Sequence, residues 1–304
     1  MKRIIIAGGS GFIGSALAKE FSRRGYAVVV LTRSPRERTD GAQEVFWDSR
    51  SGKWMEHFEG AEAVINLTGK NVNCPHTPEN VRRIISSRVD SVNAVAAAIA
   101  STNVRPRVWV QASAIGFYGD TQDRLADESA PNGQDTLAQI CREWEAAAAA
   151  AKTPDTRQVT LRIGFVLGRE GGALPVLTKL VKFFLGGAVG TGKQFISWIH
   201  LADLVQMFVV AVEDENLSGT FNAVAPNAVT NTEFMRELRR ALHRPWSPPA
   251  PEFAVKLGAR LMGSEPSLAL VSQRCEPKRF REAGFEFQYS NLSSALENLC
   301  RNHS

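Results

Sequence analysis

Three glycines spaced three residues apart lie close to the amino terminus, at Gly8, Gly11 and Gly14, directly after an apolar run. In a phosphate-binding turn between strand and helix, the first glycine allows a tight turn and the second admits a pyrophosphate to the backbone. The third allows close helix packing. Backbone N–H groups at the positive end of the helix then bind the phosphate charge. We therefore predict a dinucleotide-binding turn rather than a purely structural one. Its contact residues are predicted to be Gly8, Ser10, Gly11, Phe12, Ile13 and Gly14.

Basic residues follow the second predicted strand, residues 27–31. Arg33 and Ser34 come first, with Arg36 and Arg38 close behind. An NAD site usually carries an acidic residue about 20 residues beyond the glycines, where it binds the ribose 2′-hydroxyl. A guanidinium would instead pair with a 2′-phosphate, which a carboxylate would repel. The sequence therefore predicts that Arg33 and Ser34 contact NADP, with a solvated basic loop as the alternative.

Two more predicted strands end where a cofactor would lie. One spans residues 63–67 and the other residues 108–112. The carboxyl ends of parallel strands face the ligand crevice of an open α/β sheet. We therefore expect cofactor contacts from the residues at these ends, which are Asn66, Leu67, Thr68, Gly69 and Ala112.

A long predicted helix begins at Thr77, with Pro78 at its first helical position. Arg88 lies on the apolar stripe of this helix, one heptad after Val81 and one before Val95. An arginine that faces a sheet either extends its charge to the rim or serves an anionic ligand. Position alone leaves both interpretations open, and in the second Arg88 would anchor the cofactor or an anionic substrate.

The composition excludes several classes of protein. The 304 residues carry a net charge of +5 without a lysine or arginine run, so we expect no nucleic-acid partner. No segment reaches the roughly 20 apolar residues of a membrane span, and the amino-terminal apolar run is too short for a secretory signal. The four cysteines are scattered without metal-ligand spacing. These features predict a reduced, cytoplasmic protein without a membrane partner or a metal site.

The alternation of strands and helices predicts an α/β fold. We expect a Rossmann-type doubly wound parallel sheet of about seven strands, with a smaller interleaved C-terminal lobe. Residues 1–165 are assigned to the NADP-binding core, with a strand at 219–225 added to its sheet. Residues 166–218 and 226–304 are assigned to a substrate lobe and a helical tail, which includes one further predicted strand near residues 286–288.

The order of these motifs resembles the extended short-chain dehydrogenase/reductase superfamily, in its NAD(P)-dependent epimerase/dehydratase branch. More narrowly, the chain is similar to the atypical epimerase subgroup related to cell-division inhibitor homologues. The motifs that carry the broader resemblance are residues 8–14, 66–69, 118–119 and 200–203. Those that carry the narrower one are residues 86–88, 162–164, 166–169, 197–200, 224–227, 277–280 and 283–285.

The chain departs from this family at the residues that transfer protons. The resemblance implies a Tyr and a Lys four residues apart on one face of the helix after the fifth strand, where Tyr acts as general acid/base. Counting back from Glu145, these positions hold Leu137 and Cys141. Neither Leu nor a neutral thiol can do that work, and Cys141 is most simply a small core residue.

Three other residues are candidates to replace the missing pair. Tyr118 is the one tyrosine expected near the nicotinamide, although it could equally be an aromatic plug. The resemblance places His200 beside the cleft, where it is either an acid/base or a cap on the following helix. Ser113 lies one residue before the slot of the family's helper serine, which Ala114 occupies. We therefore name Tyr118, His200 and Ser113 as candidate catalytic residues.

Two functions remain open at this point. The first is an NADP-dependent oxidoreductase or epimerase-like enzyme that acts on an unknown small molecule. The second is a catalytically silent NADP(H)-sensing regulator or binding module linked to cell division, since the usual proton relay is absent. A protein partner or a homodimer is compatible with both.

Overall fold

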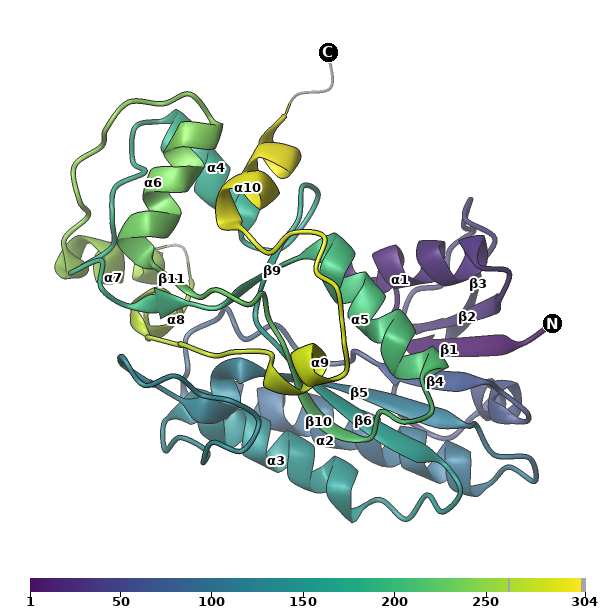
Figure 1. Ribbon diagram of the computed structural model, residues 1–304. Helices are drawn as coiled ribbons and strands as arrows, with labels where there is room; N and C mark the ends of the chain where they lie inside the picture. The colour runs from purple at the N-terminus through teal and green to yellow at the C-terminus, as the bar shows by residue number, and fades with distance from the viewer. Residues whose placement is uncertain (262, 302–304) are drawn as a thin grey trace.

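The computed structural model describes residues 1–261 and 263–301 and is built around a seven-stranded parallel sheet (Figure 1). The spatial order is β10-β6-β5-β4-β1-β2-β3. This is the doubly wound order that reverses beside β1, so the predicted fold class is confirmed. The strands are β1 Arg3–Ala7, β2 Ala27–Thr32, β3 Gln43–Phe46, β4 Ala63–Asn66, β5 Val108–Ala114, β6 Arg157–Ile163 and β10 Gly219–Ala223.

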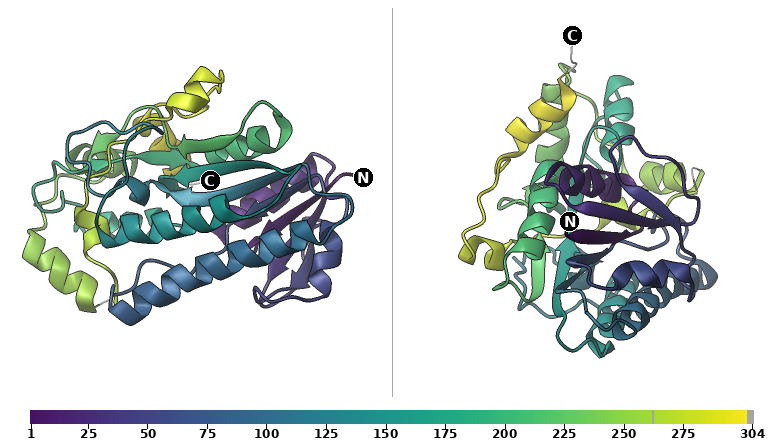
Figure 2. Two further views of the ribbon diagram at one scale, coloured as in Figure 1. Left: turned by 90° about the horizontal axis from the view of Figure 1, so that it is seen from below. Right: turned by 90° about the vertical axis from the view of Figure 1, so that its right-hand side faces the viewer.

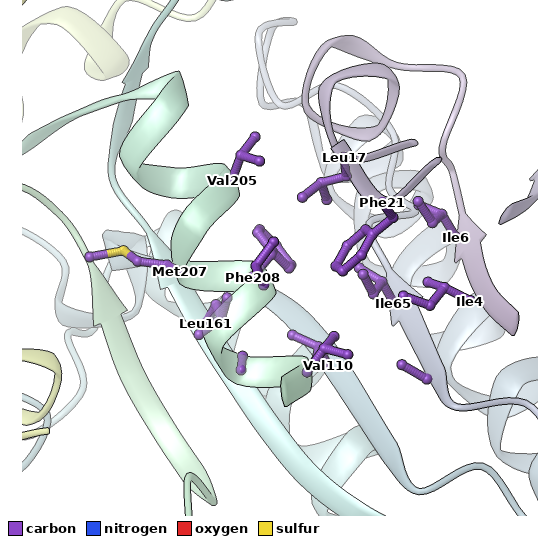
Figure 3. Close-up of a cluster of buried hydrophobic side chains, with 14 of the residues drawn as sticks. Ile4, Ile6, Leu17, Phe21, Ile65, Val110, Leu161, Val205, Met207 and Phe208 are labelled. Atoms are coloured by element: carbon purple, nitrogen blue, oxygen red, sulfur yellow. The ribbon is translucent and has the colours of Figure 1, made fainter. Parts of the chain in front are cut away.

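Helices cover both faces of the sheet because its central strands are apolar on both sides. Helices α1 (Phe12–Arg23) and α5 (Leu201–Glu213) lie on one face, while α2 (Pro78–Ala100) and α3 (Thr136–Ala150) run along the other (Figure 2). Figure 3 shows Phe21 of α1 and Phe208 of α5 in the core of the first face. The helices thereby fix the positions of the strand ends, where the predicted cofactor-binding residues lie.

A smaller lobe is built from segments after β6. Strand β7 (Phe165–Leu167) pairs in parallel with β9 (Trp198–His200), and β8 (Phe195–Ile196) pairs antiparallel with β11 (Val229–Thr230). Helices α4 (Leu174–Lys182), α6 (Asn231–Ala241) and α10 (Leu292–Cys300) pack around a separate apolar core. The remaining short elements are η1 Lys53–Phe58, η2 Ile115–Tyr118, α7 Glu252–Leu261, α8 Ser267–Leu270 and α9 Lys278–Glu282.

Two features of this lobe differ from the sequence analysis. The predicted strand at 286–288 is wrong, because that segment is irregular and the amides of Gln288 and Tyr289 donate to the carboxylate of Asp203 at 2.8 and 2.9 Å. Helix α6 was not anticipated, although Thr230 and Glu233 form a complete capping box at its start.

The described residues contain no helix that is both long and apolar enough to cross a bilayer. All four cysteines lie within the described part of the chain, and each is a free thiol.

Candidate active site

The glycine turn joins β1 to α1 with the geometry that its sequence predicts. Gly8 has a φ of +75°, which a residue with a side chain rarely adopts, and a Cβ there would crowd Thr68. Gly11 is the N-cap of α1, and within the described residues no side chain caps this helix. The first-turn amides of Phe12 and Ile13 have no acceptor within the helix, so they are available to an anion.

The other two glycines have different roles. A Cβ at Gly11 would meet only the Gly8 carbonyl, at 3.6 Å, so the space beside it is open. A Cβ at Gly14 would overlap the Cα of Gly9. We predicted close packing of Gly14 on the sheet, and the structure shows that its tight neighbour is instead the glycine turn itself.

The side chain of Phe12 contributes packing rather than polarity. Cβ atoms at Gly168 and Gly171 would overlap its ring, so the segment after β7 lies directly on the start of α1. The smaller lobe is therefore fixed against the glycine turn at this point.

Next to the turn, β4 ends where the strand order reverses. The amide of Leu67 donates to the Ala7 carbonyl at 2.9 Å, which keeps the two strands together to their ends. The Asn66 amide nitrogen donates to Ser91 and Gln111, and its oxygen accepts from the Thr68 amide. The Asn66 side chain is thus occupied inside the protein, and its predicted cofactor contact would have to come from the backbone.

The arginines of the loop after β2 differ in whether they have a carboxylate partner. Arg38 pairs with Asp40 and Glu44. Arg33 is exposed, and among the described residues it has no carboxylate partner within ion-pair distance. Ser34 follows it, and its amide lies 3.4 Å from the Thr32 hydroxyl. Arg33 is therefore available to a ligand at the end of β2, whereas Arg38 is not.

Arg88 reaches the end of β4 from helix α2. Its Nη1 donates to the carbonyls of Lys70 and Ile84, at 2.9 and 3.1 Å, and its guanidinium lies over the ring of Trp144. A Cβ at Gly69 would lie 2.8 Å from the guanidinium carbon. Arg88 is only 9% exposed, so it does not extend to the rim as one interpretation held. Burial lowers its pKa, but an arginine keeps its charge in a protein.

A buried polar network joins β5, α3 and β6. Arg162 donates to both Glu145 oxygens, at 2.9 and 2.8 Å, and Ser113 donates to Glu145 at 2.6 Å. The third nitrogen of Arg162 donates to the Tyr118 hydroxyl at 2.8 Å. Ser113 and Tyr118 are thus brought together as we expected of one site, but the link between them is the Arg162–Glu145 ion pair, which we did not predict from the sequence.

The hydroxyl of Tyr118 is fully used by this network. It accepts from Arg162 and donates to the side chain of Asn222 at 2.7 Å, in a position that is 1% exposed. Burial raises the pKa of Tyr118 to about 12. This geometry favours the aromatic plug over the general acid, and a catalytic role for Tyr118 stays a prediction without geometric support.

His200 is similarly engaged, away from this network. Its Nδ1 accepts from the Ala202 amide at 3.0 Å and so caps α5, while its Nε2 lies 3.3 Å from Asn298. The ring stacks on Tyr289, and burial lowers its pKa to about 4. Both nitrogens are therefore occupied, and the arrangement favours the capping role over proton transfer.

The positions of the missing Tyr and Lys lie on α3 beside Gly116. A Cβ at Gly116 would meet Leu137 at 3.4 Å and the Cys141 sulfur at 3.5 Å. Burial raises the pKa of Cys141 to about 12, so this thiol stays protonated. Ala112, the predicted contact on β5, is buried in the core on that face. The part of α3 beside Gly116 is apolar, and any polar group there must come from another element.

The two later glycines of the turn give a matched test. Gly14→Ala should lower the free energy of unfolding by about 3 kcal/mol, because its methyl group overlaps backbone that cannot move aside. Gly11→Ala should leave stability within about 0.5 kcal/mol, since the neighbouring space is open. Urea unfolding of both variants measures this. Equal losses would contradict the assigned roles.

The neutral, buried state of His200 predicts a pH effect on stability. Its folded pKa of about 4 lies below the ordinary 6.5, so the unfolded chain binds the additional proton as the pH falls between these values. Wild type should therefore lose about 2–3 kcal/mol more than His200→Asn between pH 7 and 4.5. Asn keeps the cap without titrating. Parallel stability curves for the two proteins would show that His200 is not buried in its neutral form.

Comparison with known proteins gives the chain its family. Residues 4–223 match the NAD dependent epimerase/dehydratase family, and residues 250–299 match a domain of unknown function. The chloroplastic Epimerase family protein SDR39U1 homolog of Arabidopsis thaliana is 35% identical over 303 residues, which cover 96% of this chain and 85% of the relative.

Two solved structures extend the likeness to the whole fold. The human epimerase family protein SDR39U1, crystallised with NADPH, has a TM-score of 0.87 at 30% identity and covers 98% of this chain and 99% of its own. The nucleoside-diphosphate sugar epimerase from Corynebacterium glutamicum has a TM-score of 0.79 at 30% identity, covering 98% of this chain and 58% of its own. The chain therefore belongs to the NAD dependent epimerase/dehydratase family, with the Rossmann-type fold of an atypical extended short-chain dehydrogenase/reductase.

Proposed function

We propose that this protein is an NADP(H)-dependent enzyme that moves a hydride to or from a small organic substrate. The observation that carries the proposal is that, among the described residues, α1 has no side-chain cap and Arg33 at the end of β2 has no carboxylate partner. Amides at a helix start favour a pyrophosphate, and an unpaired guanidinium favours a 2′-phosphate. The human relative that was solved with NADPH supports the same choice.

The residues at the sheet edge fit this cofactor. The backbone at Gly11, Phe12 and Ile13 would bind the pyrophosphate, since the space beside Gly11 is open. Arg33, assisted by Ser34, would hold the 2′-phosphate. When it is bound, NADP(H) supplies the hydride. The protein's own contribution is to hold and orient both ligands.

The proton for such a reaction is proposed to come from water or from the substrate. The hydroxyls of Ser113 and Tyr118 and both nitrogens of His200 already have protein partners.

We further propose that the protein works in a reduced, cytoplasmic setting. The free cysteines and the similar protein from the bacterium Corynebacterium glutamicum support this proposal.

The hydrogen bonds that occupy Ser113, Tyr118 and His200 also support a second candidate function, a regulator that binds NADP(H) without catalysing a reaction. A Tyr and Lys proton relay contributes roughly 10²–10⁴-fold to a reaction rate, and a protein that protonates no substrate can lose it without consequence. Such a regulator must give its ligand-bound and free forms different affinities for a partner, because equal affinities transmit no signal.

Cofactor choice is tested by calorimetric titration of NADPH and NADH. Wild type should prefer NADPH, and Arg33→Ala should lose about 1.5–3 kcal/mol of NADPH affinity, the range for hydrogen bonds to a charged group. Affinity for NADH should not change. Lys19→Ala, which removes an exposed cation from α1, is the control. Equal affinity of the wild type for the two nucleotides would contradict the proposal.

Enzyme and regulator are separated by a turnover screen. Carbonyl compounds and sugar nucleotides are mixed with protein and NADPH, and NADPH absorbance is followed. The enzyme should turn over at least one substrate, and Tyr118→Phe and His200→Asn should reduce the rate far less than the roughly 10²–10⁴-fold of a lost general acid. A loss of that size would make the named residue catalytic. No turnover, together with a partner whose affinity depends on NADPH, would favour the regulator.

A further inference from the structure

A segment of the matched domain of unknown function is tied into both lobes beside the candidate site. This strap, residues 271–276, links α8 to α9 (Figure 1). On one side, the Thr121 amide donates to the Ser272 carbonyl at 2.8 Å, and the Ala126 amide donates to the Arg274 carbonyl at 2.8 Å. On the other, the Gln273 amide donates to the Phe195 carbonyl at 2.9 Å. The backbone of the strap is therefore fixed in place on both sides.

The strap directs one polar side chain toward the apolar face of α3. A Cβ at Gly116 would have the Gln273 Nε2 atom 3.9 Å away, and Leu137 and the Cys141 sulfur slightly closer. This amide nitrogen is enclosed and has no hydrogen-bond partner among the described residues. A buried donor without an acceptor costs about 1–3 kcal/mol, so its presence calls for an explanation.

Arg88 is a second donor with the same deficit. Its Nε atom is enclosed and lacks a partner among the described residues, and its Nη2 atom makes no protein hydrogen bond there. The guanidinium lies over Trp144, one helical turn beyond Cys141 on α3. A buried cation is stable only when an anion or a full set of acceptors compensates its lost hydration, and two carbonyls do not complete that set.

Resting on the proposed function, we propose that Gln273 and Arg88 bind the substrate, and that the substrate is a carbonyl compound carrying a carboxylate. Arg88 supplies the cation for the carboxylate, and Gln273 donates to the second oxygen acceptor over Gly116. Gln273 faces the α3 positions of Leu137 and Cys141 across Gly116, and Arg88 lies over Trp144, about one turn further along α3. The polar contacts that α3 lacks are thus provided from α2 and from the strap, which gives the C-terminal domain a role in substrate binding.

The alternative source of the anion is the cofactor, whose phosphates also carry oxygen acceptors. The two sources make different predictions. If Arg88 binds a cofactor phosphate, its removal weakens NADPH binding. If it binds a substrate carboxylate, its removal leaves NADPH affinity nearly unchanged and weakens a carboxylate probe.

The test is calorimetric titration of oxalate, a small dicarboxylate, into the full-length protein saturated with NADPH. Oxalate should bind wild type, and Gln273→Leu and Arg88→Met should each weaken binding about ten- to a hundredfold, with NADPH affinity within about threefold of wild type. Arg82→Met, on the exposed face of α2, and Gln43→Leu, on β3, are matched controls that should bind oxalate normally.

Thermal unfolding without ligand is the second readout. Because Arg88 is a buried charge with no carboxylate partner among the described residues, Arg88→Met should melt at or above the wild-type temperature, whereas removal of a merely structural residue would lower it. If Arg88→Met does not fold, Gln273→Leu carries the test.

Several results would overturn the proposal: no oxalate binding by wild type, unchanged binding by both variants, or a loss confined to NADPH in Arg88→Met. Failure of wild type to bind NADPH would instead refute the proposed function. Oxalate titration of the nucleotide-free protein would still decide whether the two donors bind a carboxylate.

Discussion

A parallel sheet has to be covered on both faces, and this requirement determines where the protein can bind a ligand. The strand order reverses between β1 and β4, so α1 leaves toward one face while α2 covers the other. At the carboxyl edge between them, neither helix covers the ends of the strands. The glycine turn keeps side chains out of this place, and the first amides of α1 give it a positive character. The smaller lobe, which contacts Phe12 through the segment after β7, approaches the same edge.

Two buried arginines near this edge, Arg162 and Arg88, differ in how their charge is compensated. Arg162 and Glu145 form a bidentate pair, and Ser113 and Tyr118 complete its hydrogen bonds. Removing one partner of such a pair typically costs 3–5 kcal/mol, so these residues are committed to the fold. Arg88 has no carboxylate within the described chain and relies on two carbonyls and an aromatic ring. The first arrangement is complete without a ligand and the second is not. On our proposal, this difference separates polar groups that serve the fold from Arg88, which awaits a ligand.

Much of this could be predicted from the sequence, because the signals were local. The glycine spacing, the apolar strands and the position of Arg33 each depend on a few neighbouring residues. The roles of Tyr118 and His200 could not be settled, since their partners Arg162, Asn222 and Asn298 are distant in sequence. The only sign of the Arg162–Glu145 pair in the sequence is that both residues are charged and lie in segments that become largely buried. No sequence pattern indicated Gln273, because its position over Gly116 depends on a strap that is held by two other segments.

We propose that NADP(H) lies across the carboxyl edge, with its phosphates at α1 and Arg33. A crystal structure of the protein grown with NADPH tests it most directly. We expect the pyrophosphate on the amides of Phe12 and Ile13, and the 2′-phosphate within hydrogen-bond distance of the Arg33 guanidinium. A nucleotide whose pyrophosphate lies away from α1, or whose 2′-phosphate points into solvent, would contradict it.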